Sequence, residues 1–353
     1  MNARYPEFVV AGTPREMGNQ LGEAARELLL GFVDLATDQV CDFWSGPLEL
    51  VYDCARASAA LVYRSTPLLM EEIEGVADAA GLKVEQVMLL QIRNQLEASA
   101  QGGCTSVGMQ GPNQGKAINL IGQNWDNDPK LDPYTIVLTR RPTTGRAILT
   151  VGQVGLIGYI GVSQSGVALC LNSLPAPAKS VGVPHYFLVR ELFSCQSMGE
   201  GLAMLKRRPR ALPANLMVAT PDAVADIELT NDSLQVLPTD RDGFVAHSNH
   251  CVHPDLAAIN RTFPELIDSY ARKRRVDALA TVQADQGVDG IKSMLSDHQG
   301  FPRSICRHSN DDPKHGHWKT VFSVVIEAHE SRMWISRGNP CETAFEVYEL
   351  QDA

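Results

Sequence analysis

The chain has 353 residues, of which 44% are hydrophobic and 20% are charged, and it carries a net charge of -10. This is the composition of a globular protein that can bury a large core in one domain or two. The acidic balance argues against nucleic acid or an anionic membrane as the main partner.

The eight cysteines lack the CxxC spacing of metal and redox motifs, and the N-terminal residues contain no apolar signal core. We therefore expect reduced thiols and no disulfide framework. No segment approaches the ~18 consecutive apolar residues that a membrane-spanning helix requires. These features together favour a cytoplasmic protein that does not associate with membranes.

Helical signals fill the first hundred residues. Thr13, Pro14 and Glu16 form a capping box with proline at the first helical position, and Gly81 is typical of the residue after a helix. The predicted elements of this part are a short strand ending at residue 10 and helices over 14–44, 48–64, 67–80 and 84–96.

Strand patterns dominate after residue 104. Residues 104–110 and 116–123 flank a turn-forming segment and are predicted to form a hairpin. The other predicted strands are 134–140, 147–151, 167–171, 224–229, 234–237, 320–326, 332–336 and 344–348, and the predicted helices are 186–195, 200–207 and 255–296. Glycines at 152, 155, 158 and 161 indicate close backbone packing. Runs of strands around a run of helices favour an α+β sandwich.

The bond between Gly103 and Cys104 lies where helix gives way to strand, and it is a candidate self-cleavage site. Glycine before the cysteine permits the strained backbone that a thiol needs to attack its own preceding carbonyl. Cleavage would expose an α-amine with a pKa of about 7.7–8.0 beside a thiol with a pKa of about 8.5. The amine could then accept the thiol proton, so the sequence predicts a nucleophile that carries its own base.

The hairpin also predicts the neighbours of this cysteine. If its turn is centred on Asn113, Cys104 pairs with Gly122, and Asn124 and Asp126 project from the same face as Cys104. Asp126 would then hold the new ammonium group and tune its pKa. The alternative interpretation of Asp126 is a carboxylate that caps the following loop.

A second polar cluster contains His247, His250 and His253 at a spacing of three. These histidines could serve a metal-dependent hydrolase, although strand alternation would put the first two on opposite faces and no HExxH motif accompanies them. Asn249 in the same segment could donate to a tetrahedral oxyanion, or simply form a turn. We expect no metal ion and no cofactor.

Two basic clusters, at 206–210 and 272–275, oppose the acidic balance of the chain. We interpret them as solvated faces and ends of helices. The alternative is a seat for the phosphates of an acyl carrier such as coenzyme A.

The chain resembles the acyl-coenzyme A:isopenicillin N acyltransferase family of N-terminal nucleophile hydrolases. The resemblance is carried by Gly103-Cys104-Thr105, Gly122-Gln123-Asn124-Trp125-Asp126 and Ser248-Asn249-His250, and extends to segments 10–18, 304–308 and 338–341. It implies an αββα sandwich preceded by a helical segment, and autocatalytic cleavage before Cys104. Residues 1–103 would form a mainly helical α-chain and residues 104–353 a β-chain, which together make one domain and an intramolecular heterodimer.

The resemblance also implies the roles of individual residues. Cys104 corresponds to the nucleophile, Asp126 to the carboxylate near it and Asn249 to the oxyanion asparagine, with Asn124 and His250 as candidate supporting residues. The implied activity is hydrolysis or transfer of the acyl group of a small N-acyl amide through a thioester, with a coenzyme A thioester as a candidate acyl donor. The remaining alternative is a non-catalytic binding protein of the same fold.

Overall fold

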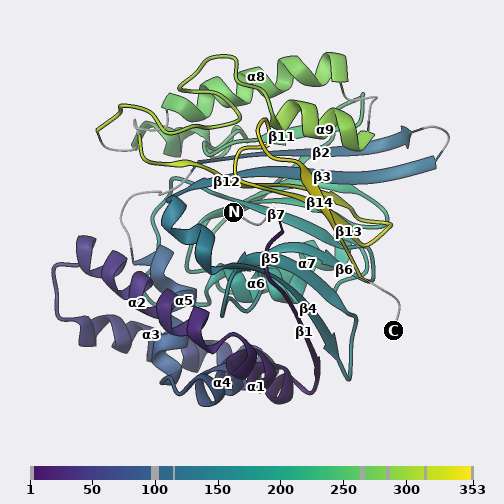
Figure 1. Ribbon diagram of the computed structural model, residues 1–353. Coiled ribbons are helices and arrows are strands. Elements are labelled where there is room, and N and C mark those ends of the chain that lie inside the picture. Colours follow the sequence, from purple (N-terminus) through teal and green to yellow (C-terminus); the bar gives the residue numbers. More distant parts are fainter. Residues whose placement is uncertain are drawn as a thin grey trace.

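Two β-sheets lie face to face at the centre of the molecule, and helices cover the outer face of each (Figure 1). The computed structural model describes residues 4–96, 103–113, 116–262, 267–283, 287–313 and 316–350. The first sheet contains, in spatial order, β1 (Glu7–Gly12), β4 (Thr135–Pro142), β5 (Ile148–Gln153), β6 (Ile160–Ser163), β7 (Ala168–Ser173), β8 (Ala214–Ala219), β9 (Val224–Leu229) and β10 (Leu234–Pro238). The second contains β11 (Phe244–His247), β2 (Gly103–Asn113), β3 (Lys116–Asn127), β12 (Lys319–Glu327), β13 (Arg332–Arg337) and β14 (Phe345–Glu349).

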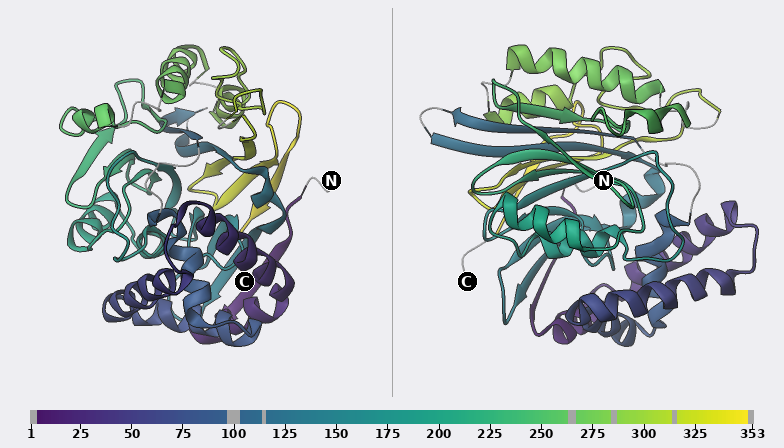
Figure 2. Two further views of the ribbon diagram at one scale, coloured as in Figure 1. Left: turned by 90° about the vertical axis from the view of Figure 1, so that its left-hand side faces the viewer. Right: turned by 180° about the vertical axis from the view of Figure 1, so that it is seen from behind.

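The helices complete a four-layer arrangement that is visible from the side in Figure 2. The second sheet is covered by α8 (Ile267–Gln283) and α9 (Gly287–Leu295). On the side of the first sheet lie α1 (Pro14–Ala24), α2 (Arg26–Phe43), α3 (Leu48–Ser65), α4 (Pro67–Ala80), α5 (Val84–Ile92), α6 (His185–Leu192) and α7 (Met198–Arg207). Short 3₁₀ helices are η1 (Arg93–Gln95), η2 (Pro129–Tyr134) and η3 (Ala257–Thr262). The predicted αββα sandwich with a helical N-terminal segment is confirmed.

The N-terminal helices follow their local signals closely. The capping box of Thr13 with Glu16 is present, and Gly81 ends α4 in the left-handed conformation at φ +73. One helix predicted over 14–44 is instead two, which meet at Ala25. The direction of α1 is set by its close contact with α4, where a Cβ added to Gly18 would lie 2.1 Å from the Glu72 carbonyl oxygen.

The sheets depart from the prediction where burial hides the pattern. Strands β6 and β8 were not predicted, because every residue of each is buried and the alternation of polar and apolar residues disappears. The helix predicted over 255–296 is divided into η3, α8 and α9. Close packing at the repeated glycines is confirmed, since a Cβ added to Gly161 would lie 2.2 Å from the Leu149 carbonyl oxygen.

The two larger apolar cores among the described residues hold the layers together. The larger fills the space between the sheets and continues into the N-terminal helices, and it includes Cys104 and Trp125. The smaller lies between the second sheet and helices α8 and α9, and it includes Val107 and Leu120. Alternate residues of β2 and β3 therefore enter different cores. None of the described helices combines the length and the hydropathy that crossing a membrane requires.

Candidate active site

Cys104 is the second residue of β2, and only 4% of its surface is exposed. Its backbone N–H donates to Asn249 Oδ1 at 2.9 Å, and its carbonyl oxygen accepts a hydrogen bond from Arg272. Its side chain belongs to the core between the sheets, together with that of Trp125. Polar side chains from two distant segments thus meet at the backbone of this cysteine.

The predicted register of the β2–β3 hairpin is wrong. Cys104 lies opposite Trp125 rather than Gly122, and Gly103 lies opposite Asp126. Strand β2 extends to Asn113 and β3 begins at Lys116, so the turn is tighter than predicted. The partner of Cys104 therefore lies an odd number of residues further along β3 than the predicted one. Because such a shift reverses the faces, Asp126 does not project from the same face as Cys104.

Asp126 nevertheless lies beside the peptide bond that precedes the cysteine. A Cβ added to Gly103 would lie 3.3 Å from Asp126 Oδ2. The other carboxylate oxygen accepts from Thr320 Oγ1 at 2.7 Å, while Oδ2 has no hydrogen-bond partner among the described residues. Burial raises the pKa of Asp126, and the guanidinium groups of Arg272 and Arg307 oppose that shift.

Asn124 lies on the face of β3 that carries Asp126, opposite the face of Cys104. Its side-chain amide donates to the carbonyl oxygens of Leu295 at 2.7 Å and Ile305 at 3.0 Å. Its contacts therefore anchor the end of α9 and the segment that follows, and the expectation that it shares the face of the thiol is wrong.

Arg272 is a site residue that the sequence analysis misassigned. It is 3% exposed, and it donates to Thr105 Oγ1 at 2.9 Å and to Asn249 Oδ1 at 2.7 Å as well as to the Cys104 carbonyl. The interpretation of 272–275 as a solvated face or a phosphate seat is therefore wrong at this residue. Its helical spacing from Ser269 and Val276, which are both buried, is the sequence feature that could have placed Arg272 on the buried face of the helix.

The basic cluster at 206–210 is also partly used within the fold. Arg208 forms an ion pair with Glu191 at 2.5 Å. Arg210 is 8% exposed and donates to the carbonyl oxygens of Thr230 and Leu205. Neither arginine presents a free guanidinium to an acyl carrier.

Asn249 reaches Cys104 because β11 pairs with β2. Ser106 lies opposite His247 at the end of β11. Because the strands are antiparallel, Asn249, two residues after His247, comes level with Cys104, two residues before Ser106. Both the Cys104 N–H and Arg272 donate to Oδ1, which identifies that atom as the oxygen. The amide nitrogen donates to the carbonyl oxygen of Ser173 at 3.1 Å and to its Oγ at 3.2 Å.

His250 supports this asparagine through a serine. Its Nδ1 lies 2.8 Å from Ser269 Oγ, and that oxygen accepts the backbone N–H of Asn249 at 2.8 Å. Burial is the main cause that lowers the pKa of His250 to about 4, so the ring is neutral at pH 7. Its contact with the site is indirect.

The three histidines do not converge on a metal site. His247 Nε2 lies 2.8 Å from Glu228 Oε1, His250 bonds Ser269, and His253 Nδ1 lies 3.8 Å from Asp255. The group able to hold a metal that is found among the described residues lies elsewhere and contains none of the three. The alternative of a metal-dependent hydrolase built on these histidines is therefore wrong.

The Cys104 thiol is neutral in this environment. Burial, followed by the negative charge of Asp126, raises its pKa to about 12. Arg272, the backbone N–H of Asp126 and the side chain of Gln123 act in the opposite direction. Because the thiolate is the nucleophilic form of cysteine, this thiol would need a base in order to act as a nucleophile.

Comparison with known proteins identifies relatives of the chain. Residues 112–342 match the family described as acyl-coenzyme A:6-aminopenicillanic acid acyl-transferase. The 40 kDa form of the acyl-coenzyme A:6-aminopenicillanic-acid-acyltransferase of Emericella nidulans is 26% identical over 338 residues, which cover 93% of this chain and 91% of that protein.

Two hydrolases are among the similar solved structures. A mutant conjugated bile acid hydrolase from Clostridium perfringens is 12% identical with a TM-score of 0.45, covering 70% of this chain and 97% of that one. Penicillin V acylase from Agrobacterium tumefaciens is 11% identical with a TM-score of 0.38, covering 68% of this chain and 76% of that one.

Proposed function

Because the chain belongs to the acyl-coenzyme A:6-aminopenicillanic acid acyl-transferase family, we propose that it cleaves itself between Gly103 and Cys104 and then transfers acyl groups through Cys104. Membership makes the chain an enzyme, so the alternative of a non-catalytic binding protein is set aside. The observation that carries the proposal is the 2.9 Å hydrogen bond from the Cys104 nitrogen to Asn249, with Arg272 on the adjoining carbonyl.

The processing step exchanges an amide for a thioester. The Cys104 sulfur bonds to the Gly103 carbonyl carbon, the thiol proton passes to the Cys104 nitrogen, and the carbon–nitrogen bond breaks. Water then adds to the thioester carbonyl, a proton returns to sulfur, and Gly103 becomes a carboxyl terminus. The two products, residues 1–103 and 104–353, stay together as a heterodimer.

The new α-amine then serves as the base. Arg272 disfavours its protonation, whereas the Asp126 carboxylate favours it. The amine takes the thiol proton as sulfur attacks the carbonyl carbon of the substrate amide, and it passes the proton to the departing amine. Water or an acceptor amine then releases the acyl group from the thioester.

Asn249 has two tasks in this scheme. Its Oδ1 orients the α-amine, because it already accepts from the same nitrogen in the uncut chain. Its amide nitrogen carries two protons. That nitrogen donates to both the carbonyl oxygen and the Oγ of Ser173, so it would have to give up the bond to Oγ to donate to the oxyanion of the tetrahedral intermediate.

The substrate that we propose is a small N-acyl amide. The thiol belongs to the apolar core between the sheets, beside Trp125 and Tyr159, whose side chains are joined by a 2.8 Å hydrogen bond. Aromatic walls of this kind suit an apolar acyl group. A coenzyme A thioester could load the same sulfur, although Arg208, Arg210 and Arg272 of the basic clusters are engaged within the fold.

Intact mass and N-terminal sequencing test the processing step. Wild type should appear as two chains, one of them beginning Cys-Thr-Ser, and Cys104→Ala should remain a single chain. Cys170→Ala is the matched control, since Cys170 is also a buried free cysteine and Cys104 lies near enough to contribute to its raised pKa. Wild-type protein that never yields Cys104 as a terminus would contradict the proposal.

The acyl-transfer step is tested on processed protein. It should release the amine from some members of a panel of N-acyl amides, and added acceptor amines should divert the acyl group from water. If an acylating probe that labels thiols fails to reach Cys104, the nucleophile is misassigned.

A further inference from the structure

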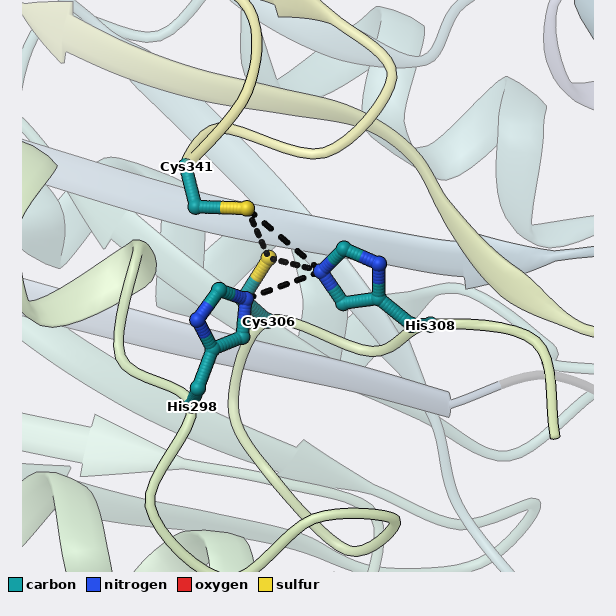
Figure 3. A group of neighbouring side chains, drawn as sticks. All are labelled: His298, Cys306, His308 and Cys341. Carbon is teal, nitrogen blue, oxygen red and sulfur yellow. Dashed lines mark hydrogen bonds between the residues drawn. The ribbon is translucent and has the colours of Figure 1, made fainter.

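Two histidines and two cysteines from separate segments meet near the second sheet (Figure 3). His298 follows α9, Cys306 and His308 precede β12, and Cys341 lies in the turn between β13 and β14. One ligand atom from each residue lies within 4.8 Å of all the others. No metal was expected from the sequence, in which the eight cysteines lack CxxC spacing.

We propose that this cluster, the Cys₂His₂ site, binds a structural zinc ion. Thiolate and imidazole are the ligands of closed tetrahedral zinc sites, and four protein ligands leave no open position for catalysis. The ion would be separate from the acyl-transfer chemistry at Cys104, which this proposal does not require.

The distances among His308 Nε2 and the two sulfurs match those of a tetrahedron around zinc. Standard zinc–ligand bonds place two sulfurs about 3.8 Å apart, sulfur and nitrogen about 3.6 Å apart and two nitrogens about 3.3 Å apart. Here the Cys306 and Cys341 sulfurs are 3.7 Å apart, and His308 Nε2 lies 3.6 Å and 3.4 Å from them. The Nε2 atoms of His298 and His308 are 2.8 Å apart, so small movements would open the centre for the ion.

The surroundings supply the outer contacts that metal ligands usually have. The side-chain amide of Asn339 donates to Cys306 Sγ at 3.4 Å, which suits a thiolate. Glu342 Oε1 lies 3.7 Å from the Nδ1 of His308, the ring nitrogen that faces away from the cluster. A carboxylate in that position favours the tautomer whose Nε2 is free to bind metal. Cys306 is buried, while His298 and Cys341 are exposed, so an ion can enter from solvent.

The Cys₂His₂ site would fasten the segment that carries Arg307. This arginine lies between two of the ligands, and its carbonyl oxygen accepts from Asn339 at 2.7 Å. Its guanidinium opposes the raised pKa of Asp126, and a Cβ added to Gly103 would lie 3.4 Å from its Nη1. Zinc would thus hold Arg307 in place as a positioning element. Binding exchanges the two thiol protons for the ion.

Metal analysis of the full chain, purified with a reductant, tests this inference. We expect one zinc per chain by elemental analysis, and loss of that zinc in Cys306→Ser and in Cys341→Ser. Cys41→Ser is the control, because Cys41 is exposed and outside the cluster. Asn339→Ala should weaken zinc binding by roughly 10-fold, as expected for an outer contact.

Cobalt gives a second readout that does not depend on activity or on self-cleavage. Adding Co²⁺ to metal-free protein should produce the sulfur-to-metal charge-transfer band and the intense visible bands of a tetrahedral thiolate site. Both should vanish in Cys306→Ser and persist in Cys104→Ala, which distinguishes failure of this site from failure of the proposed nucleophile.

Two outcomes would overturn the proposal. One is reduced wild-type protein that neither retains zinc nor takes it up when ZnCl₂ is added. The other is a disulfide between Cys306 and Cys341 that resists the reductant, detected as a mass two hydrogens lower than the thiol form.

Discussion

Arg272 illustrates how one buried side chain organises a site. It contacts a backbone carbonyl, a hydroxyl and an amide oxygen that come from β2 and from the segment after β11. Burial lowers its pKa, and the nearby Asp126 opposes that change. A planar guanidinium with several fixed donors can make these contacts at once, whereas the single ammonium of lysine cannot.

His185 in α6 is a second buried polar residue, and its burial makes the stability of the fold depend on pH. It is 4% exposed, and neither ring nitrogen has a hydrogen-bond partner within the described part of the chain. Burial, followed by the positive charge of Arg93, lowers its pKa to about 3. The ring must therefore stay neutral in the folded protein, although in the unfolded chain it charges near pH 6.5.

His185 should make the protein less stable in mild acid. Its folded pKa lies below its unfolded pKa, so the unfolded chain binds more protons between about pH 3 and 6.5. Its contribution to stability is complete above the unfolded pKa and declines as the pH falls, by roughly 2 kcal/mol between pH 7 and 5. The loss of unfolding free energy between pH 7 and pH 5, measured by urea titration, should be smaller by that amount in His185→Leu than in wild type.

The matched control for this prediction is His329→Gln, since His329 is exposed. It should retain the pH dependence of wild type. An unchanged pH dependence in His185→Leu would show that His185 is not the group responsible.

At the scale of elements, a buried ion pair joins the N-terminal helices to the first sheet. Glu72 of α4 is 2% exposed and bonds Arg140 Nε of β4 at 2.7 Å. A second guanidinium, that of Arg190 in α6, lies 3.5 Å from the other carboxylate oxygen. Removing Glu72 would leave both arginines buried without their counter-ion.

Glu72→Ala should therefore lower the free energy of unfolding by roughly 3–5 kcal/mol. Glu74→Ala provides the comparison, because Glu74 pairs with Arg15 at 2.9 Å on a partly exposed surface. That change should cost less than about 1 kcal/mol. Denaturant titration of the two variants measures both, and equal losses would contradict the assigned importance of the buried pair.

At the scale of the whole molecule, the proposed cleavage does not divide the fold. Strand β1 pairs in parallel with β4, so the N-terminal piece supplies part of the first sheet. The Tyr5 backbone N–H also donates to Tyr348 Oη at 2.8 Å, and the larger core runs through both pieces. Their association depends on the same burial that stabilises the uncut chain.

Processed protein should accordingly behave as one particle. The two pieces should co-elute in equal amounts on size exclusion under native conditions and separate only in denaturant. Loss of the 1–103 piece from the processed protein on a native column would show that the interface is weaker than its burial indicates.

The parts of the fold that follow from short-range chemistry were predictable. The capping box at Thr13, the left-handed Gly81 and the antiparallel pairing of β2 with β3 each depend on residues close together in the chain. The Gly103–Cys104 bond was also recognisable, because a glycine–cysteine pair at a change from helix to strand is a local feature. Cys104, Asp126 and Asn249 do lie at one place, around the peptide bond between Gly103 and Cys104.

The parts that depend on distant residues were not predictable. The face of Asp126 follows from how far β2 and β3 extend, and the reach of Asn249 to Cys104 follows from the pairing of β11 with β2. Arg272 looked like one cation of a solvated run, and only packing of α8 on the second sheet buries it.

By itself, then, the sequence determined the change from a helical first part to a mainly stranded remainder, the capped ends and the glycine–cysteine bond at their junction. Backbone preferences and turn chemistry operate over a few residues, so they can be read along the chain. Tertiary structure alone decided which faces meet, which arginine is buried and where the four zinc-type ligands converge. Those outcomes depend on strand register and on burial between remote segments, and neither property can be read from the residue at any one position of the sequence.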